Sequence, residues 1–346
     1  MSNKPGSQPV TLRDVAAAAG VSVSTASRAL TDGRYVSADK LERIREAAES
    51  IGYQPNEGAR NLRSSRTMTI GLVSHDLRSP ALLDLIRGMT EAVEGTGYSV
   101  FIANAAGRVT NYRTLVRRLF ERRADALLLI NPDGVSKEVE AFSESGRPVL
   151  AALSLGADCA HLPFVYSDES SAMRDAMRRL AALGHRSLAY LVHPSELQST
   201  RPSFTAEIAR EFNVVSSLIP FKSGGPPAET TDLLKRVLSS EAHPTALLLA
   251  HGGLGQLLGA IRGLKMEIPR DLSIVTFSDS THTEGLIVPA IATIHTDLQK
   301  MGQEIIGMLL AALAGAELPA RADVALSSWV EAESVGPAPI TETPIA

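Results

Sequence analysis

Apolar residues near the start of the chain recur with the spacing of three short helices. The first helix is predicted to begin near Thr11, where Asp14 can complete a cap. Its apolar face comprises Leu12, Val15, Ala16 and Ala19. After a turn at Gly20, a second helix from about 23 to 30 offers Ala26, Ala29 and Leu30. A third, from about 38 to 51, offers Leu41, Ile44, Ala48 and Ile51 and ends at Gly52. This arrangement is typical of a helix-turn-helix.

The second of these helices is rich in hydroxyl residues, which are unfavourable inside a helix. Ser22, Ser24, Thr25 and Ser27 fall on its outward face or at its N-terminal end, together with Arg28. Short hydroxyl side chains allow close approach to a major groove, and an arginine is long enough to reach a guanine. An ordinary solvated helix face is the alternative. The surrounding three-helix frame favours DNA binding.

The rest of the chain alternates between strand-like and helix-like segments. Near-continuous apolar runs precede or follow helical patterns: TIGLV, YSVFIAN, ALLLI, PVLAAL, SLAYLV, TALLLA and LSIVTF. Strands that are apolar on both faces predict a parallel sheet covered by helices on both sides. The expected fold class is therefore α/β behind an all-α head.

Three segments together resemble the LacI/GalR family of bacterial transcription regulators: TLRDVAAAAGVSVSTASRAL, VSADKLERIREAAESIGYQPN and ARNLRSSRTMTIGLV. The resemblance implies a helix-turn-helix head at 1–55 and a hinge helix or linker at 56–66. It also implies a periplasmic-binding-protein-like core at 67–331, with two Rossmann-like subdomains for effector binding and dimerisation. Residues 332–346 are expected to form a disordered tail. Ligands of such sheets lie beyond the carboxyl ends of the strands.

The resemblance also assigns DNA-binding roles. Its base-reading positions are Val23, Ser24 and Arg28. Its phosphate-contacting positions are Leu12, Ser22, Thr25, Ser27, Ser37, Tyr53 and Asn56, and Thr11 belongs to the same interface. In the hinge, Ala59 allows two copies to approach closely, and Leu62 is expected to act as an apolar wedge in the minor groove.

The predicted effector site departs from the family pattern at most of its polar positions. The family's usual residues are replaced at Ser79, at Asp168, at His251 and at Ser278, which precedes a retained Asp279, while Arg201 is kept. Three histidines directly follow predicted strands: His75, His193 and His251. A site rich in donors and poor in carboxylates favours an anionic effector over a simple sugar. The alternative is that the histidines cap strands and bond to nearby backbone.

Charge and composition narrow the remaining functions. Residues 1–66 carry a net charge of +3, and the rest of the chain carries −7, which fits a local polyanion contact in the head. The single cysteine, Cys159, excludes an intrachain disulfide and fits a cytoplasmic location. No signal sequence or membrane-length apolar run is present. GGLGQLLG lacks the third glycine of a dinucleotide fingerprint, and Leu258 takes its place.

Two alternatives to a regulator remain open at this point. A solute-binding protein would share the core but lack the DNA-binding head. An enzyme would need a catalytic motif, and none is recognisable. We therefore expect a homodimeric repressor that binds a pseudo-palindromic operator under the control of a small molecule. No enzyme activity, cofactor, bound metal or membrane partner is expected.

Overall fold

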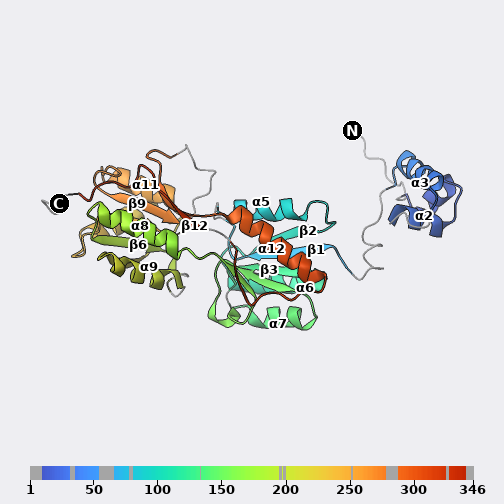
Figure 1. Ribbon diagram of the computed structural model, residues 1–346, viewed down its shortest axis with the longest axis horizontal. Coiled ribbons are helices and arrows are strands. Elements are labelled where there is room, and N and C mark those ends of the chain that lie inside the picture. Colours follow the sequence, from blue (N-terminus) through green and yellow to red (C-terminus); the bar gives the residue numbers. More distant parts are fainter. Residues whose placement is uncertain are drawn as a thin grey trace. The chain divides into compact units, whose positions relative to one another are not determined.

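The computed structural model of the 346-residue chain describes residues 10–31, 36–53, 66–77, 81–132, 134–194, 197, 200–250, 252–277, 287–324 and 327–339. The chain divides into two compact units, Met1–Thr67 and Met68–Ala346. Figure 1 shows that the first unit is helical and that helices flank the sheets of the second.

The first unit contains the three predicted helices: α1 (Leu12–Ala18), α2 (Val23–Thr31) and α3 (Ala38–Ser50). Small apolar side chains from all three helices form its core: Val15, Ala16, Ala19, Ala26, Ala29, Ile44 and Ala48. Arg43 on α3 donates a hydrogen bond of 2.6 Å to the carbonyl oxygen of Ala19, which joins α3 to the end of α1. Small residues allow the helices to pack closely in so short a segment.

The first sheet of the second unit has the order β11-β5-β4-β3-β1-β2, with every neighbouring pair parallel. Its strands are β1 (Thr69–Ser74), β2 (Ser99–Asn104), β3 (Ala126–Ile130), β4 (Val149–Ala152), β5 (Phe164–Tyr166) and β11 (Arg321–Asp323). Helices α5 (Ala81–Val93) and α12 (Leu298–Leu313) pack on one face. Helices α6 (Val109–Glu121) and α7 (Ser136–Glu144) pack on the other (Figure 1). A short 3-10 helix, η1 (Ala157–Cys159), precedes β5.

The second sheet has the order β12-β10-β9-β8-β6-β7, and only the edge strand β12 is antiparallel to its neighbour. Its strands are β6 (Ser187–Val192), β7 (Val215–Pro220), β8 (Ala246–Leu249), β9 (Ser273–Phe277), β10 (Ala292–Thr296) and β12 (Ser327–Val330). Helices α8 (Ser170–Ala182) and α9 (Thr200–Glu211) cover one face, and α10 (Pro227–Leu238) and α11 (Leu254–Gly263) cover the other. The predicted pair of parallel α/β subdomains is confirmed.

The chain passes between the two sheets three times, after β5, after β10 and between β11 and β12. Hydroxyl groups join the three crossings. The Ser327 hydroxyl lies 2.7 Å from the Ser167 hydroxyl and 2.9 Å from the Thr296 hydroxyl. The backbone N–H of Asp168 also donates to the carboxylate of Asp323 at 3.2 Å. The crossings are therefore tied to one another by side chains rather than by a continuous strand ladder.

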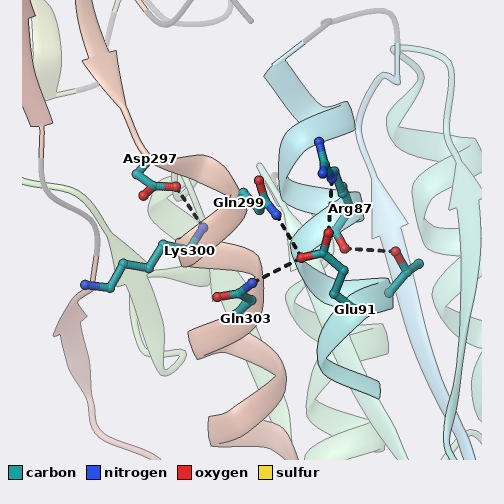
Figure 2. Close-up of polar contacts among 7 residues, drawn as sticks. Arg87, Glu91, Asp297, Gln299, Lys300 and Gln303 are labelled. Atoms are coloured by element: carbon teal, nitrogen blue, oxygen red, sulfur yellow. Dashed lines mark hydrogen bonds and ion pairs between the residues drawn. The ribbon is translucent and has the colours of Figure 1, made fainter. Parts of the chain in front are cut away.

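Helices α5 and α12 approach each other unusually closely on the first sheet. Gly302 of α12 faces the backbone of Leu85, and Gly88 of α5 faces the backbone of Gln299. Beside this contact, the Glu91 carboxylate accepts hydrogen bonds from Gln299 at 2.8 Å and from Gln303 at 3.1 Å (Figure 2). These bonds, with that from Arg87, lower the pKa of Glu91. Polar side chains thus flank a glycine contact between two helices distant in sequence.

The last described segment corrects one prediction. Residues 332–346 were expected to be disordered, but residues 332–339 pack against the second sheet. Ser334 is fully buried; its hydroxyl donates to the Ile274 carbonyl at 2.6 Å and accepts from the Ala292 N–H at 2.8 Å. The Gly336 N–H donates to the Ser273 hydroxyl at 3.1 Å. This segment is held by individual hydrogen bonds, and its sequence lacks the periodic apolar pattern that predicts a helix or strand. Residues 340–346 lie outside the described residues.

Candidate nucleic-acid interface and effector site

The start of α1 is fixed by a reciprocal cap. The carboxylate of Asp14 accepts hydrogen bonds of 2.7 Å from both the backbone N–H and the hydroxyl of Thr11. Both hydrogen bonds lower the pKa of Asp14, and the bond from the backbone N–H has the larger effect. Leu12, the next residue, is half-buried and packs on the three-helix core. The predicted phosphate contact at Leu12 would therefore come from a helix start that is held in place before DNA arrives.

A hydroxyl cluster caps α2. Ser22 accepts a hydrogen bond from the backbone N–H of Thr25 at 3.2 Å. Its hydroxyl also lies 2.9 Å from that of Ser24 and 2.8 Å from that of Thr25. The cluster therefore satisfies the helix end and leaves hydroxyl groups at the surface, where they can bind phosphate.

The two faces of α2 differ sharply. Ala26 and Ala29 are buried in the core, whereas Val23 is 43% exposed and Ser24 and Arg28 are also exposed. The Nε of Arg28 donates to the carbonyl oxygen of Ser24 at 3.3 Å, so the guanidinium rests against its own helix. This face carries the three predicted base-reading residues. Val23 and Ser24 are short, so Arg28 has the side chain that can reach farthest toward a base. Ser27 is half-buried at the edge of the face.

The remaining predicted DNA contacts divide into described and undescribed positions. Ser37 is exposed at the N-cap of α3, and Tyr53 is half-buried against the core, with its N–H bonded to the Ala48 carbonyl at 2.8 Å. Asn56, Ala59 and Leu62 lie outside the described residues. The hinge therefore stays a prediction.

The strongest polar contact among the predicted effector residues involves Arg201, at the start of α9. Its Nε and Nη2 donate to the two carboxylate oxygens of Glu169 at 2.7 and 2.9 Å. Its guanidinium also stacks on the ring of Phe277, 4.6 Å from the ring centre. Glu169 is only 8% exposed, so its carboxylate is largely shielded from water, whereas Arg201 is half-buried. A two-point arginine–carboxylate pair fixes both the orientation and the charge of Arg201.

The other described effector candidates are half-buried or exposed at strand ends. His75 follows β1 and His193 follows β6, and both are half-buried. Asp168 is exposed and accepts from the backbone N–H of Ser170 at 2.9 Å, and its pKa is lowered by hydrogen bonds to Ser170. Asp168 therefore accepts a hydrogen bond from the first residue of α8. The remaining candidates lie outside the described residues: Ser79, His251, Ser278 and Asp279.

Glu169 is the residue that sequence reasoning missed. It lies beside the predicted Asp168 but 32 positions from Arg201, and only the packing of α8 and α9 side by side brings the two together. No local pattern reveals such a pairing. Among the described residues, no group of three or more His, Cys, Asp or Glu side chains is arranged to hold a metal ion.

Comparison with protein families matches both units. Residues 11–56 match the model for bacterial regulatory proteins of the lacI family, and residues 177–335 match that of a periplasmic binding protein-like domain. The first match covers all three helices of the head. The second covers most of the second sheet and the C-terminal segment that includes Ser334.

Similar proteins extend the match over most of the chain. Catabolite control protein A of Priestia megaterium is 24% identical over 306 residues, covering 85% of this chain and 89% of its own. The transcriptional repressor PurR of Haemophilus influenzae (strain PittEE) is 23% identical, covering 87% and 90%. A crystal structure of the lac repressor dimer, bound to operator and the anti-inducer ONPF, superposes with a TM-score of 0.78 at 22% identity, covering 95% and 100%.

The helix-turn-helix head and the two parallel α/β subdomains thus define a DNA-binding transcriptional regulator with an effector-binding domain. The chain belongs to the LacI family of bacterial regulatory proteins, a non-enzymatic family. No helix in the described part of the chain is long and apolar enough to cross a membrane.

Proposed function

We propose that this regulator represses transcription in the cytoplasm by binding a pseudo-palindromic operator as a homodimer. The observation that carries the proposal is the exposed face of α2, where Val23, Ser24 and Arg28 project opposite the buried alanines. Two such faces related by a two-fold axis would read two half-sites about one helical turn apart. Operator selection from a random duplex library tests this: enriched sequences should contain an inverted repeat, and enrichment of a single half-site would contradict it.

Exposed apolar side chains on sheet edges support the homodimer. Phe101, on edge strand β2 of the first sheet, is 46% exposed. Val215 and Leu218, on edge strand β7 of the second sheet, are 61% and 41% exposed. Unpaired apolar edge strands are usually covered by a partner. We propose that a second copy of this chain covers both edges.

Light scattering after size exclusion measures the dimer directly. Leu218→Asp and Phe101→Asp place a charge on the proposed interface, so we expect each to shift the mass toward that of a monomer. Val288→Asp is the control, because Val288 is 85% exposed and outside both sheets. Equal dimer content in all three variants would contradict the proposed interface.

The ion pair changes the expected effector. An anion was predicted from sequence because Arg201 and the histidines supply donors, but Glu169 already neutralises Arg201. We propose a neutral polar effector that binds near the carboxyl ends of β1, β6 and β9 and exchanges hydrogen bonds with both members of the pair. Thermal-shift measurements with neutral sugars, nucleosides, sugar phosphates and carboxylates test this proposal. Stabilisation by charged compounds alone would restore the anionic effector.

We also propose that Leu62 wedges into the minor groove. Leu62→Ala should lower specific affinity and DNA bending together, because an apolar wedge drives the kink. Circular-permutation gel shifts measure the bend. Unchanged bending by a variant with normal dimer mass would exclude the wedge.

A further inference from the structure

Helix α6 and its flanks carry the densest group of basic residues in the second unit. Residues 108–123 contain six arginines and one acid, Glu121, giving a net charge of +5, whereas the rest of 67–346 carries −12. All six arginines are exposed: Arg108, Arg113, Arg117, Arg118, Arg122 and Arg123. A basic helix on an otherwise acidic domain points to a polyanionic partner.

Most of this charge is not neutralised within the described part of the chain. Arg113, near the start of α6, lies 4.0 Å from Glu138 of α7. Arg117, Arg118 and Arg122 form no ion pair with any described residue. Arg122 rests over the exposed ring of Phe101, 5.8 Å from its centre. The free positive charge therefore gathers toward the C-terminal end of α6.

The topology places this end of α6 beside the first residues of β1. Helix α6 joins parallel strands β2 and β3, so it runs back along the sheet and ends where β3 begins. There, Ala126 pairs with Ile70, and the Asp125 N–H donates to the Thr69 carbonyl at 2.8 Å. The chain enters this unit from the DNA-binding head at the same point. The arginines therefore border the end of the sheet nearest the linker.

We propose that the basic end of α6, formed by Arg117, Arg118 and Arg122, binds the phosphate backbone of DNA flanking the operator. The proposal rests on the proposed function, because the head must first hold the protein on DNA. Fifteen residues separate Tyr53 of the head from Thr69, which limits the span between them to about 50 Å even when fully extended. Such a tether keeps duplex DNA at high local concentration around the arginines, which favours DNA over an acidic protein.

The test compares two duplexes that contain the selected operator. One ends at the operator, and the other extends about two helical turns beyond it on each side. Affinity is measured by fluorescence anisotropy over a range of salt concentrations. The wild-type protein should bind the longer duplex more tightly and with a steeper dependence on salt, because each phosphate contact adds about 0.9 to the slope of log affinity against log salt.

Arg118→Gln/Arg122→Gln should remove the advantage of the longer duplex and leave binding to the short duplex unchanged. Arg118→Lys/Arg122→Lys should keep the advantage, because phosphate binding needs the charge. Arg262→Gln is the matched control. Arg262 is also exposed in the last turn of a helix, but this helix, α11, packs on the second sheet. Equal salt slopes for wild type and the glutamine variant on both duplexes would overturn the proposal. Absence of specific binding to either duplex would instead overturn the proposed function.

Discussion

Gly302 of α12 lies against the carbonyl oxygen of Leu85 on α5, so closely that any side chain at position 302 would overlap that oxygen. The two helices belong to segments more than 200 residues apart, and α12 begins directly after the crossing from the second sheet. Helix α12 follows one of the crossings between the two sheets, and this contact fixes it on the first sheet. Glu91 reinforces it through Gln299 and Gln303.

Gly302→Ala should destabilise the fold by about 3 kcal/mol, because the added methyl group meets backbone atoms that can move only if the helices separate. Urea unfolding measures the change. Gly307→Ala in the same helix is the control: nothing lies near its missing side chain, and alanine there should stabilise by about 0.5–1 kcal/mol. Similar effects at the two positions would mean that the helices are not in close contact.

His185 should make stability fall in mild acid. Its Nδ1 lies 2.8 Å from the Thr245 hydroxyl and its Nε2 lies 3.0 Å from the Gly336 carbonyl, which suits the neutral ring. Burial lowers the pKa of His185, so the unfolded chain binds a proton more readily than the native state. The stability contributed by the neutral ring is complete above the unfolded pKa of about 6.5 and falls as pH drops toward the lower folded value.

Urea unfolding at pH 7.5 and 5.5 tests this prediction. The loss of stability between these pH values should be smaller in His185→Gln than in wild type, whereas the same change at exposed His161 should leave it unaltered. An identical loss in wild type and His185→Gln would show that other groups set the acid response.

Glu169→Gln should change which ligands the effector site accepts. Removing the carboxylate takes away the negative charge paired with Arg201 beside Phe277, so anions that do not stabilise wild type should raise the melting temperature of the variant. Glu211→Gln, which removes the exposed partner of Arg174, is the control. An anion response present in wild type and unaffected by Glu169→Gln would place the effector elsewhere.

Truncation tests the role of the C-terminal segment. Ending the chain after Glu331 removes buried hydrogen bonds made by Ser334 and Gly336, among them the bonds to Ile274, Ala292 and Ser273, and each contributes roughly 1 kcal/mol. We expect a loss of about 3 kcal/mol or more in urea unfolding. Ending the chain after Pro339 retains these bonds and should leave stability unchanged; equal losses from both truncations would contradict the packing of this segment.

Much of the fold follows from the sequence because its signals are local. Helical spacing places α1, α2 and α3 within a residue or two of their observed ends, and apolar runs mark most of the buried strands. The cap made by Asp14 and Thr11 is likewise visible within four residues.

The rest of the site depends on contacts between distant segments. Glu169 contacts Arg201 only because α8 and α9 pack together. The hydrogen-bond partners of Ser334 lie on strands tens of residues before it in the sequence. Neither has a periodic pattern. A list of donors read from the sequence therefore could not include the carboxylate of Glu169, which stands outside every motif.

Base reading by α2 is tested by measuring how wild type and Arg28→Ala bind the selected operator and duplexes changed at each base pair in turn. Wild type should prefer the operator over scrambled DNA by at least about 1,000-fold at physiological salt. Arg28→Ala should lose roughly 1–3 kcal/mol and tolerate any base at one position of each half-site. Equal binding of wild type to operator and scrambled DNA, or an equal loss on every duplex in the variant, would contradict base reading by α2.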